Sequence, residues 1–177
     1  MVVYTVRRDA PPSAHEAVTG DHFGVNLVTI YDEEFVDADP SLRRNVSDLG
    51  ATTLRFPGGS ATEFYFNMAN PDATVSSYDP SETLTPMNAF FAEAGKLGVD
   101  ATIVLPTRLA FGKSAGQAML DGTYGLREEL SADYLSELET FVRLVLTYAR
   151  HAGVQVDAFE VGNEFWGSGQ MTAAEYG

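Results

Sequence analysis

A carboxamide and a carboxyl group stand side by side near the end of this chain, on Asn163 and Glu164. They follow the mainly apolar run 158–162, which is typical of a buried strand. A carboxylic acid at a strand end, beside an amide and with Trp166 two residues later, suits acid/base chemistry on a carbohydrate. Hydrolysis of a glycosidic bond usually needs a second carboxylate across that bond. The chemistry open to this chain therefore depends on whether it supplies one.

The alternation of side chains along a strand predicts where the acids point. Glu160 and Glu164 are expected on one face, and Phe159 and Val161 on the other. If the apolar pair packs on helices, both carboxylates point to the opposite face, and a bulge just before Asn163 would turn that side chain there as well. Glu164 is the candidate acid. Its alternative role is to cap the following segment or to pair with a surface lysine.

A buried positive charge is predicted on the same face. In the expected strand 52–56, Leu54 and Phe56 should face the helices and Arg55 the carboxylates, because a buried charge needs a partner. Arg55 would hold nearby carboxylates ionised, or would only neutralise the interior. Glu160 is expected to be structural, held by Arg55 or a hydroxyl.

Five further residues are candidate carbohydrate contacts. Glycines without side chains let a sugar approach the backbone, although they also serve in turns. Aromatic rings can stack on sugars, although they more often pack in the core. The candidates are Gly58, Gly59, Asn26, Tyr65 and Trp166.

Alternating strands and helices must position these residues. Amphipathic helices are expected from Asp39 to Gly50, from Thr85 to Gly98 and from Ser131 to Gly153, each ending at a glycine. A short helix near 115–120 and a fourth helix capped by Thr172 are also expected. The strands are expected at 23–30, 52–56, 101–105 and 158–163.

The order βαβαβαβ predicts an α/β protein with a parallel sheet and right-handed crossovers. Two architectures fit, an open doubly wound sheet or the first four units of a (β/α)8 TIM barrel spanning 21–177, with 1–20 as an extension. The turn after the first strand, 30–35, is acidic and lacks glycine, unlike a nucleotide-binding turn. This favours the barrel. The long loops 58–82 and 106–130 lie where such folds build their sites.

The runs 54–59 and 159–164 resemble the first half of a clan A retaining glycoside hydrolase, most closely the arabinofuranosidase and heparanase-like β-glucuronidase families. The resemblance covers roughly 23–166. It implies a (β/α)8 barrel in which Glu164 is the acid/base, Asn163 binds the hydroxyl next to the anomeric carbon and Arg55 supports the nucleophile. Nothing here corresponds to strands five to eight, which carry that family's nucleophile. The isolated chain is therefore expected to be inactive or nearly so.

The amino-acid composition limits the classes of molecule that this chain is expected to bind. A net charge of −14 opposes nucleic acid and anionic membranes, but it permits a poly- or oligosaccharide. No cofactor or metal is expected, and no signal peptide is recognised. A soluble chain is expected, with an extracellular location slightly favoured over a cytoplasmic one. The alternative function is a non-catalytic carbohydrate-binding or interaction domain. Open barrel edges would invite self-association.

Overall fold

The computed structural model of the chain describes residues 23–111 and 130–164. Four parallel strands form one sheet in the order β1-β2-β3-β4, so each strand pairs with the next along the chain. The predicted α/β class and the parallel pairing are confirmed. The strands are β1 (Gly24–Asn26), β2 (Thr53–Phe56), β3 (Asp100–Leu105) and β4 (Val156–Val161).

Helices connect successive strands, as predicted. The connecting helices are α1 (Ser41–Asp48), α3 (Met87–Leu97) and α5 (Ala132–Ala152), and two short helices lie in the loops, η2 (Glu33–Val36) and α2 (Ala61–Phe64). Neither short helix was predicted. The three glycines expected to end the long helices all have left-handed backbone angles, with φ of 69° at Gly50, 68° at Gly98 and 73° at Gly153. The start of α5 is also as predicted, because the Ser131 hydroxyl accepts a hydrogen bond from the Tyr134 amide.

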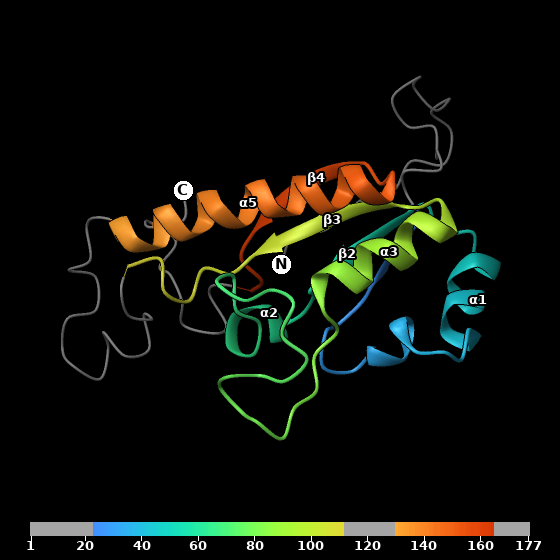
Figure 1. The fold of residues 1–177 in the computed structure, drawn as a ribbon, viewed down its shortest axis with the longest axis horizontal. Coiled ribbons are helices and arrows are strands. Elements are labelled where there is room, and N and C mark those ends of the chain that lie inside the picture. The colour runs from blue at the N-terminus through green and yellow to red at the C-terminus, as the bar shows by residue number, and fades with distance from the viewer. Residues whose placement is uncertain (1–22, 112–129, 165–177) are drawn as a thin grey trace, which may run out of the picture.

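The main core lies between the sheet and the helices (Figure 1). Leu54 and Phe56 of β2 are almost fully buried in it, as their alternation predicted, and the Phe56 ring stacks on Phe90 of α3 at 4.3 Å. Helices α3 and α5 run side by side over the strands (Figure 1). They approach closely at Gly95, where a side-chain carbon would lie 2.3 Å from the Ala152 carbonyl oxygen.

Two predicted strands have different limits in the structure. The run 23–30 is regular strand only over β1, although the Thr29 amide still donates to the Pro57 carbonyl oxygen, and the chain turns over 29–31. The Val28 amide donates to the Asp32 carboxylate at 2.7 Å. Strand β4 lies two residues earlier than expected and stops before Gly162, which has a φ of 71°. Val161 does not pack under a helix as expected. It is 45% exposed, because no described helix follows β4 to cover it.

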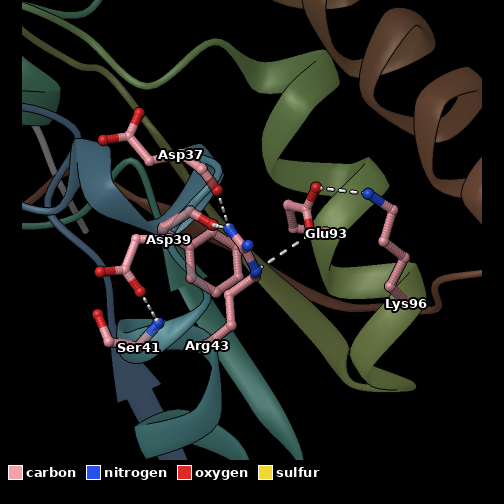
Figure 2. Close-up of polar contacts among 7 residues, drawn as sticks. Asp37, Asp39, Ser41, Arg43, Glu93 and Lys96 are labelled. Carbon is pink, nitrogen blue, oxygen red and sulfur yellow. Dashed lines mark hydrogen bonds and ion pairs between the residues drawn. The ribbon is translucent and has the colours of Figure 1, made fainter.

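Polar contacts around Arg43 join the helices that precede β2 to α3 (Figure 2). The Arg43 guanidinium of α1 donates to the carbonyl oxygens of Phe35 at 2.6 Å and Asp37 at 2.7 Å. Its Nε lies 3.4 Å from the Glu93 carboxylate of α3, which also pairs with Lys96. One arginine therefore joins η2, α1 and α3.

Three expectations fall outside the described residues. They are the extension 1–20, the short helix at 115–120 and the helix capped by Thr172. Within 23–111 and 130–164, no helix is both long enough and apolar enough to cross a membrane.

Candidate functional site

Arg55 is the centre of a polar cluster at the carboxyl ends of the strands. Its Nε and Nη2 donate to the two carboxylate oxygens of Glu160 at 2.6 and 2.7 Å, a bidentate ion pair. Its Nη1 donates to Asn26 Oδ1 at 2.7 Å and its Nη2 to Asn163 Oδ1 at 3.1 Å. Glu160 is therefore held by Arg55, as predicted. Side chains from β1, β2 and β4 and from the segment after β4 meet on the sheet face opposite the main core.

The backbone beyond β4 turns sharply at the candidate acid. Asn163 is 9% exposed, and its side chain reaches Arg55 after the left-handed Gly162. The register of β3 and β4 shows no bulge at Gly162; β4 ends at Val161 instead, and the left-handed Gly162 turns Asn163 towards Arg55. Glu164 is exposed and has a φ of 45°, which is uncommon for a residue other than glycine. Such a conformation persists only where the surrounding structure enforces it, and it is found most often at functional sites.

Glu63, which the sequence did not place in the site, lies beneath this turn. Its side chain comes from α2 and is 3% exposed. One carboxylate oxygen accepts from the backbone amides of Thr107 and Arg108, each at 2.8 Å. The other accepts from the Asn163 amide at 3.0 Å and from the Thr107 hydroxyl at 3.1 Å. A single carboxylate therefore ties the loops that follow β2, β3 and β4.

Burial raises the pKa of the Glu63 carboxyl. Loss of water around the carboxyl raises the pKa of Glu63 above its usual value of 4.5, and the hydrogen bonds from Asn163, Thr107 and Arg108 lower it by less. Nearby, the Tyr134 hydroxyl donates to the Pro106 carbonyl oxygen at 3.0 Å, and burial raises the pKa of Tyr134 to about 12.

The run Ser60-Ala61-Thr62-Glu63 indicates a helix start, because a serine followed three residues later by glutamate is typical of one, but it does not indicate an inward-pointing Glu63. The structure does begin a helix there, but the Ser60 side chain makes no capping hydrogen bond. Glu63 turns inward to the neighbouring loops instead. Those contacts span 44 and 100 residues of sequence, so no local pattern could predict them.

The two candidate glycines occupy different surroundings. A side-chain carbon on Gly58 would lie 2.3 Å from the Leu27 carbonyl oxygen and 2.8 Å from Asn26 Oδ1, so this position excludes other residues on packing grounds alone. A side-chain carbon on Gly59 would make only ordinary contact with Val28, although its φ of 56° is left-handed. Gly58 thus lies against Asn26 of the Arg55 cluster. The close approach of Leu27 and Asn26 explains why a glycine stands at this turn.

Tyr65 is not part of the Arg55 cluster. Tyr65 is half-buried, packs beside Ile30, Ala61 and Leu84, and meets the Tyr78 ring edge-on at 5.7 Å. Trp166 lies outside the described residues.

A cavity of about 510 Å³ opens on the helix side of the loops after β2 and β3. The Arg108 guanidinium lies over the rings of Phe64 and Tyr78, at 5.4 and 5.0 Å from their centres. All three residues line the cavity, together with Glu63 and Tyr134. The Arg55 cluster is not part of its lining, so cavity and cluster are separate features joined by Glu63.

Among the described residues, no group of three or more histidine, cysteine, aspartate or glutamate side chains is arranged to hold a metal ion. Comparisons of the chain with protein-family models, curated proteins and solved structures found no match. What the site can do therefore follows from its own residues and geometry.

Proposed function

We propose that this chain is the first half of a retaining glycoside hydrolase barrel and that it carries the general acid/base, Glu164. Its substrate would be a poly- or oligosaccharide linked through oxygen. The observation that carries this proposal is the Arg55 cluster. One guanidinium joins Asn26, Glu160 and Asn163, three side chains that sequence reasoning placed at a common site from residues up to 137 positions apart.

The sheet supports the same proposal. Its strands follow chain order without a reversal, and right-handed crossovers in one direction place connecting helices on one face. This is the arrangement expected of consecutive units of a (β/α)8 barrel, whereas a doubly wound sheet reverses its strand order. The Arg55 cluster would then line the barrel mouth, because Arg55, Asn26 and Glu160 stand at or next to the carboxyl ends of their strands.

The proposed mechanism has two steps. In the first, the Glu164 carboxyl gives its proton to the glycosidic oxygen as the bond from that oxygen to the anomeric carbon breaks. A nucleophilic carboxylate bonds to the same carbon, and the alcohol leaves. In the second, the Glu164 carboxylate takes a proton from water while the water oxygen attacks the anomeric carbon and releases the nucleophile. Exposure of Glu164 beyond a buried Asn163 allows its carboxyl to meet a ligand at the surface.

We assign the nucleophile to none of the described residues. The mechanism needs it about 5 Å from the acid/base. Glu160 is paired with Arg55, and Glu63 is buried under four donors, so neither carboxylate is available to attack a sugar. The resemblance places the nucleophile on a seventh strand. Arg55 would help to keep it ionised.

The test uses nitrophenyl α-arabinofuranoside and nitrophenyl β-glucuronide with the chain alone and with a form extended through four further βα units, read from the coding sequence downstream of Gly177. The extended form should hydrolyse one of them, and the chain alone should show little turnover. Glu164→Gln should lower turnover of glycosides with poor leaving groups by about 100-fold or more, because these need the proton most. Azide, which attacks without a general base, should restore activity on the nitrophenyl substrate.

Glu139→Gln is the matched control, since Glu139 is an exposed residue of α5 paired with Arg143. Turnover that survives Glu164→Gln on every leaving group would contradict the assignment. Oligosaccharide binding that is unaffected by Glu164→Gln, with no turnover by either form, would support the non-catalytic binding module instead.

A further inference from the structure

The conformation of the Asn163–Glu164 turn is held from two sides. The Asn163 side chain accepts from Arg55 at 3.1 Å, and the Asn163 amide donates to Glu63 at 3.0 Å. A side chain at the residue before the turn would displace Thr107, because a side-chain carbon on Gly162 would lie 2.8 Å from the Thr107 hydroxyl oxygen. The next residue, Glu164, has the strained φ of 45°. Strain at this position needs supporting contacts, and the contact with Glu63 supplies one.

Glu63 is well suited to that task. Removing a carboxyl from water is costly unless its oxygens receive hydrogen bonds, and Glu63 receives four. Two of them come from consecutive amides of the loop after β3, so the carboxylate itself is fixed relative to that loop. The sheet in turn fixes the loop, because β3 is a central strand paired on both sides. Glu63 thus holds the Asn163 amide at a fixed position relative to the sheet.

We infer that Glu63 is a positioning residue for the acid/base: through the Asn163 amide it sets the direction in which the Glu164 carboxyl leaves the sheet. This inference rests on the proposed function of Glu164. Glu63 itself touches no substrate in this scheme. Its effect would be on the proton transfers, which require the acid within hydrogen-bond reach of the glycosidic oxygen.

Glu63→Gln is the informative variant, since it retains shape and one oxygen. The retained oxygen is expected to stay with the two amides of Thr107 and Arg108. The new NH₂ group would then face the Asn163 amide, donor against donor. The contact to Asn163 should be lost while the contact to the β3 loop is kept.

The first measurement is amide hydrogen exchange of the chain followed by NMR. In the unsubstituted chain the Asn163 amide should be protected. In Glu63→Gln it should exchange about tenfold faster or more, since its hydrogen-bond acceptor has been removed, whereas the Arg108 amide should change little. Glu139→Gln on the α5 surface should leave both amides unchanged. An Asn163 amide that is unprotected in the unsubstituted chain would overturn the inference even if Glu63→Gln does not fold.

The second measurement separates positioning from general destabilisation. In the extended, active form, Glu63→Gln should lower kcat/KM, which reports the first step, at least about tenfold more for glycosides with poor leaving groups than for nitrophenyl glycosides, because only the former need a well-placed acid in that step. Equal losses on both substrate types would mean that Glu63 is merely structural. If Glu164→Gln itself shows no dependence on the leaving group, the proposed function fails. If Glu164→Gln shows it and Glu63→Gln does not, only the role of Glu63 fails.

Discussion

At the scale of single residues, the ion pair between Arg55 and Glu160 organises the proposed site. Its two hydrogen bonds are short, but the side chains are 24% and 40% exposed, so water screens their attraction. A double-mutant cycle with Arg55→Met and Glu160→Gln, measured by urea unfolding, should give a coupling free energy of about 1 kcal/mol. A coupling near zero would mean that Arg55 is held by Asn26 and Asn163 rather than by the ion pair.

The protonation of Glu63 gives a prediction with a definite sign. Burial raises the pKa of Glu63 above 4.5, so the folded chain holds this proton more tightly than the unfolded chain does. The stabilisation from this group is fully present below pH 4.5 and is lost as the pH rises through the folded-state pKa. The free energy of unfolding of the unsubstituted chain, relative to Glu63→Gln, should therefore fall as the pH is raised through that interval. A relative free energy that grows with pH would show that the four hydrogen bonds outweigh burial.

The sequence predicted the Arg55 side of the site but not the Glu63 side, for a physical reason. Arg55, Glu160 and Asn26 lie on regular strands, so alternation alone places them on one face. Glu63 lies in a long loop, and its direction is decided by contacts with the ends of β3 and β4. Such contacts exist only after the sheet has brought those ends together.

At the scale of elements, two left-handed glycines allow the cost of backbone strain to be measured apart from the cost of crowding a neighbour. Gly50 and Gly162 have φ values of 69° and 71°, but a side-chain carbon on Gly50 would meet nothing within 4 Å, whereas one on Gly162 would crowd Thr107. Gly50→Ala should cost about 1 kcal/mol in free energy of unfolding, from backbone strain. Gly162→Ala should cost at least about 1 kcal/mol more, because Thr107 must move. Equal losses in thermal or urea unfolding would show that the loop after β3 yields freely.

Substitution of Arg43 would measure how much its contacts with the amino-terminal elements stabilise the fold. Arg43 and Glu93 are 14% and 15% exposed, and Arg43 also holds two carbonyl oxygens (Figure 2). Arg43→Ala should lower the free energy of unfolding by about 1 to 3 kcal/mol, because those oxygens lose a charged donor. Arg143→Ala, which removes an exposed pair with Glu139 on α5, should cost only about 0.3 to 0.5 kcal/mol. Similar losses for the two variants would contradict this assignment.

The sequence predicted best the elements in which the hydrophobic repeat is long or in which a capping residue marks an end. Helix α5 repeats its apolar stripe over 21 residues between Ser131 and Gly153, and both ends lie where the sequence placed them. Strand β1 was predicted too long because apolar residues continue to Ile30, beyond the end of the regular strand at Asn26. The chain turns over 29–31, and the Asp32 carboxylate accepts from the Val28 amide, a contact that hydrophobic pattern does not report.

At the scale of the whole molecule, the two edges of the sheet are the features that favour contact with another chain. Its edge strands β1 and β4 are each paired on one side only among the described residues. Unpaired edges offer backbone donors and acceptors to another chain. Near the β4 edge, Val161 adds exposed apolar surface, which a following helix would cover in the proposed barrel. Both features favour association of this chain with a second polypeptide or with itself.

Sedimentation equilibrium can measure that tendency against the opposing charge. A net charge of −14 makes copies repel, and salt screens the repulsion. The weight-average mass should therefore rise above 19.2 kDa with protein concentration, and more steeply at higher salt. Val161→Lys should suppress this rise, because a charge beside the edge must lose its water in the contact. Leu146→Lys is the matched control, since Leu146 on α5 is 44% exposed and the substitution changes net charge equally. If both variants suppress association alike, charge and not the β4 edge governs it; a monomer at every concentration and salt would show that these edges are not adhesive.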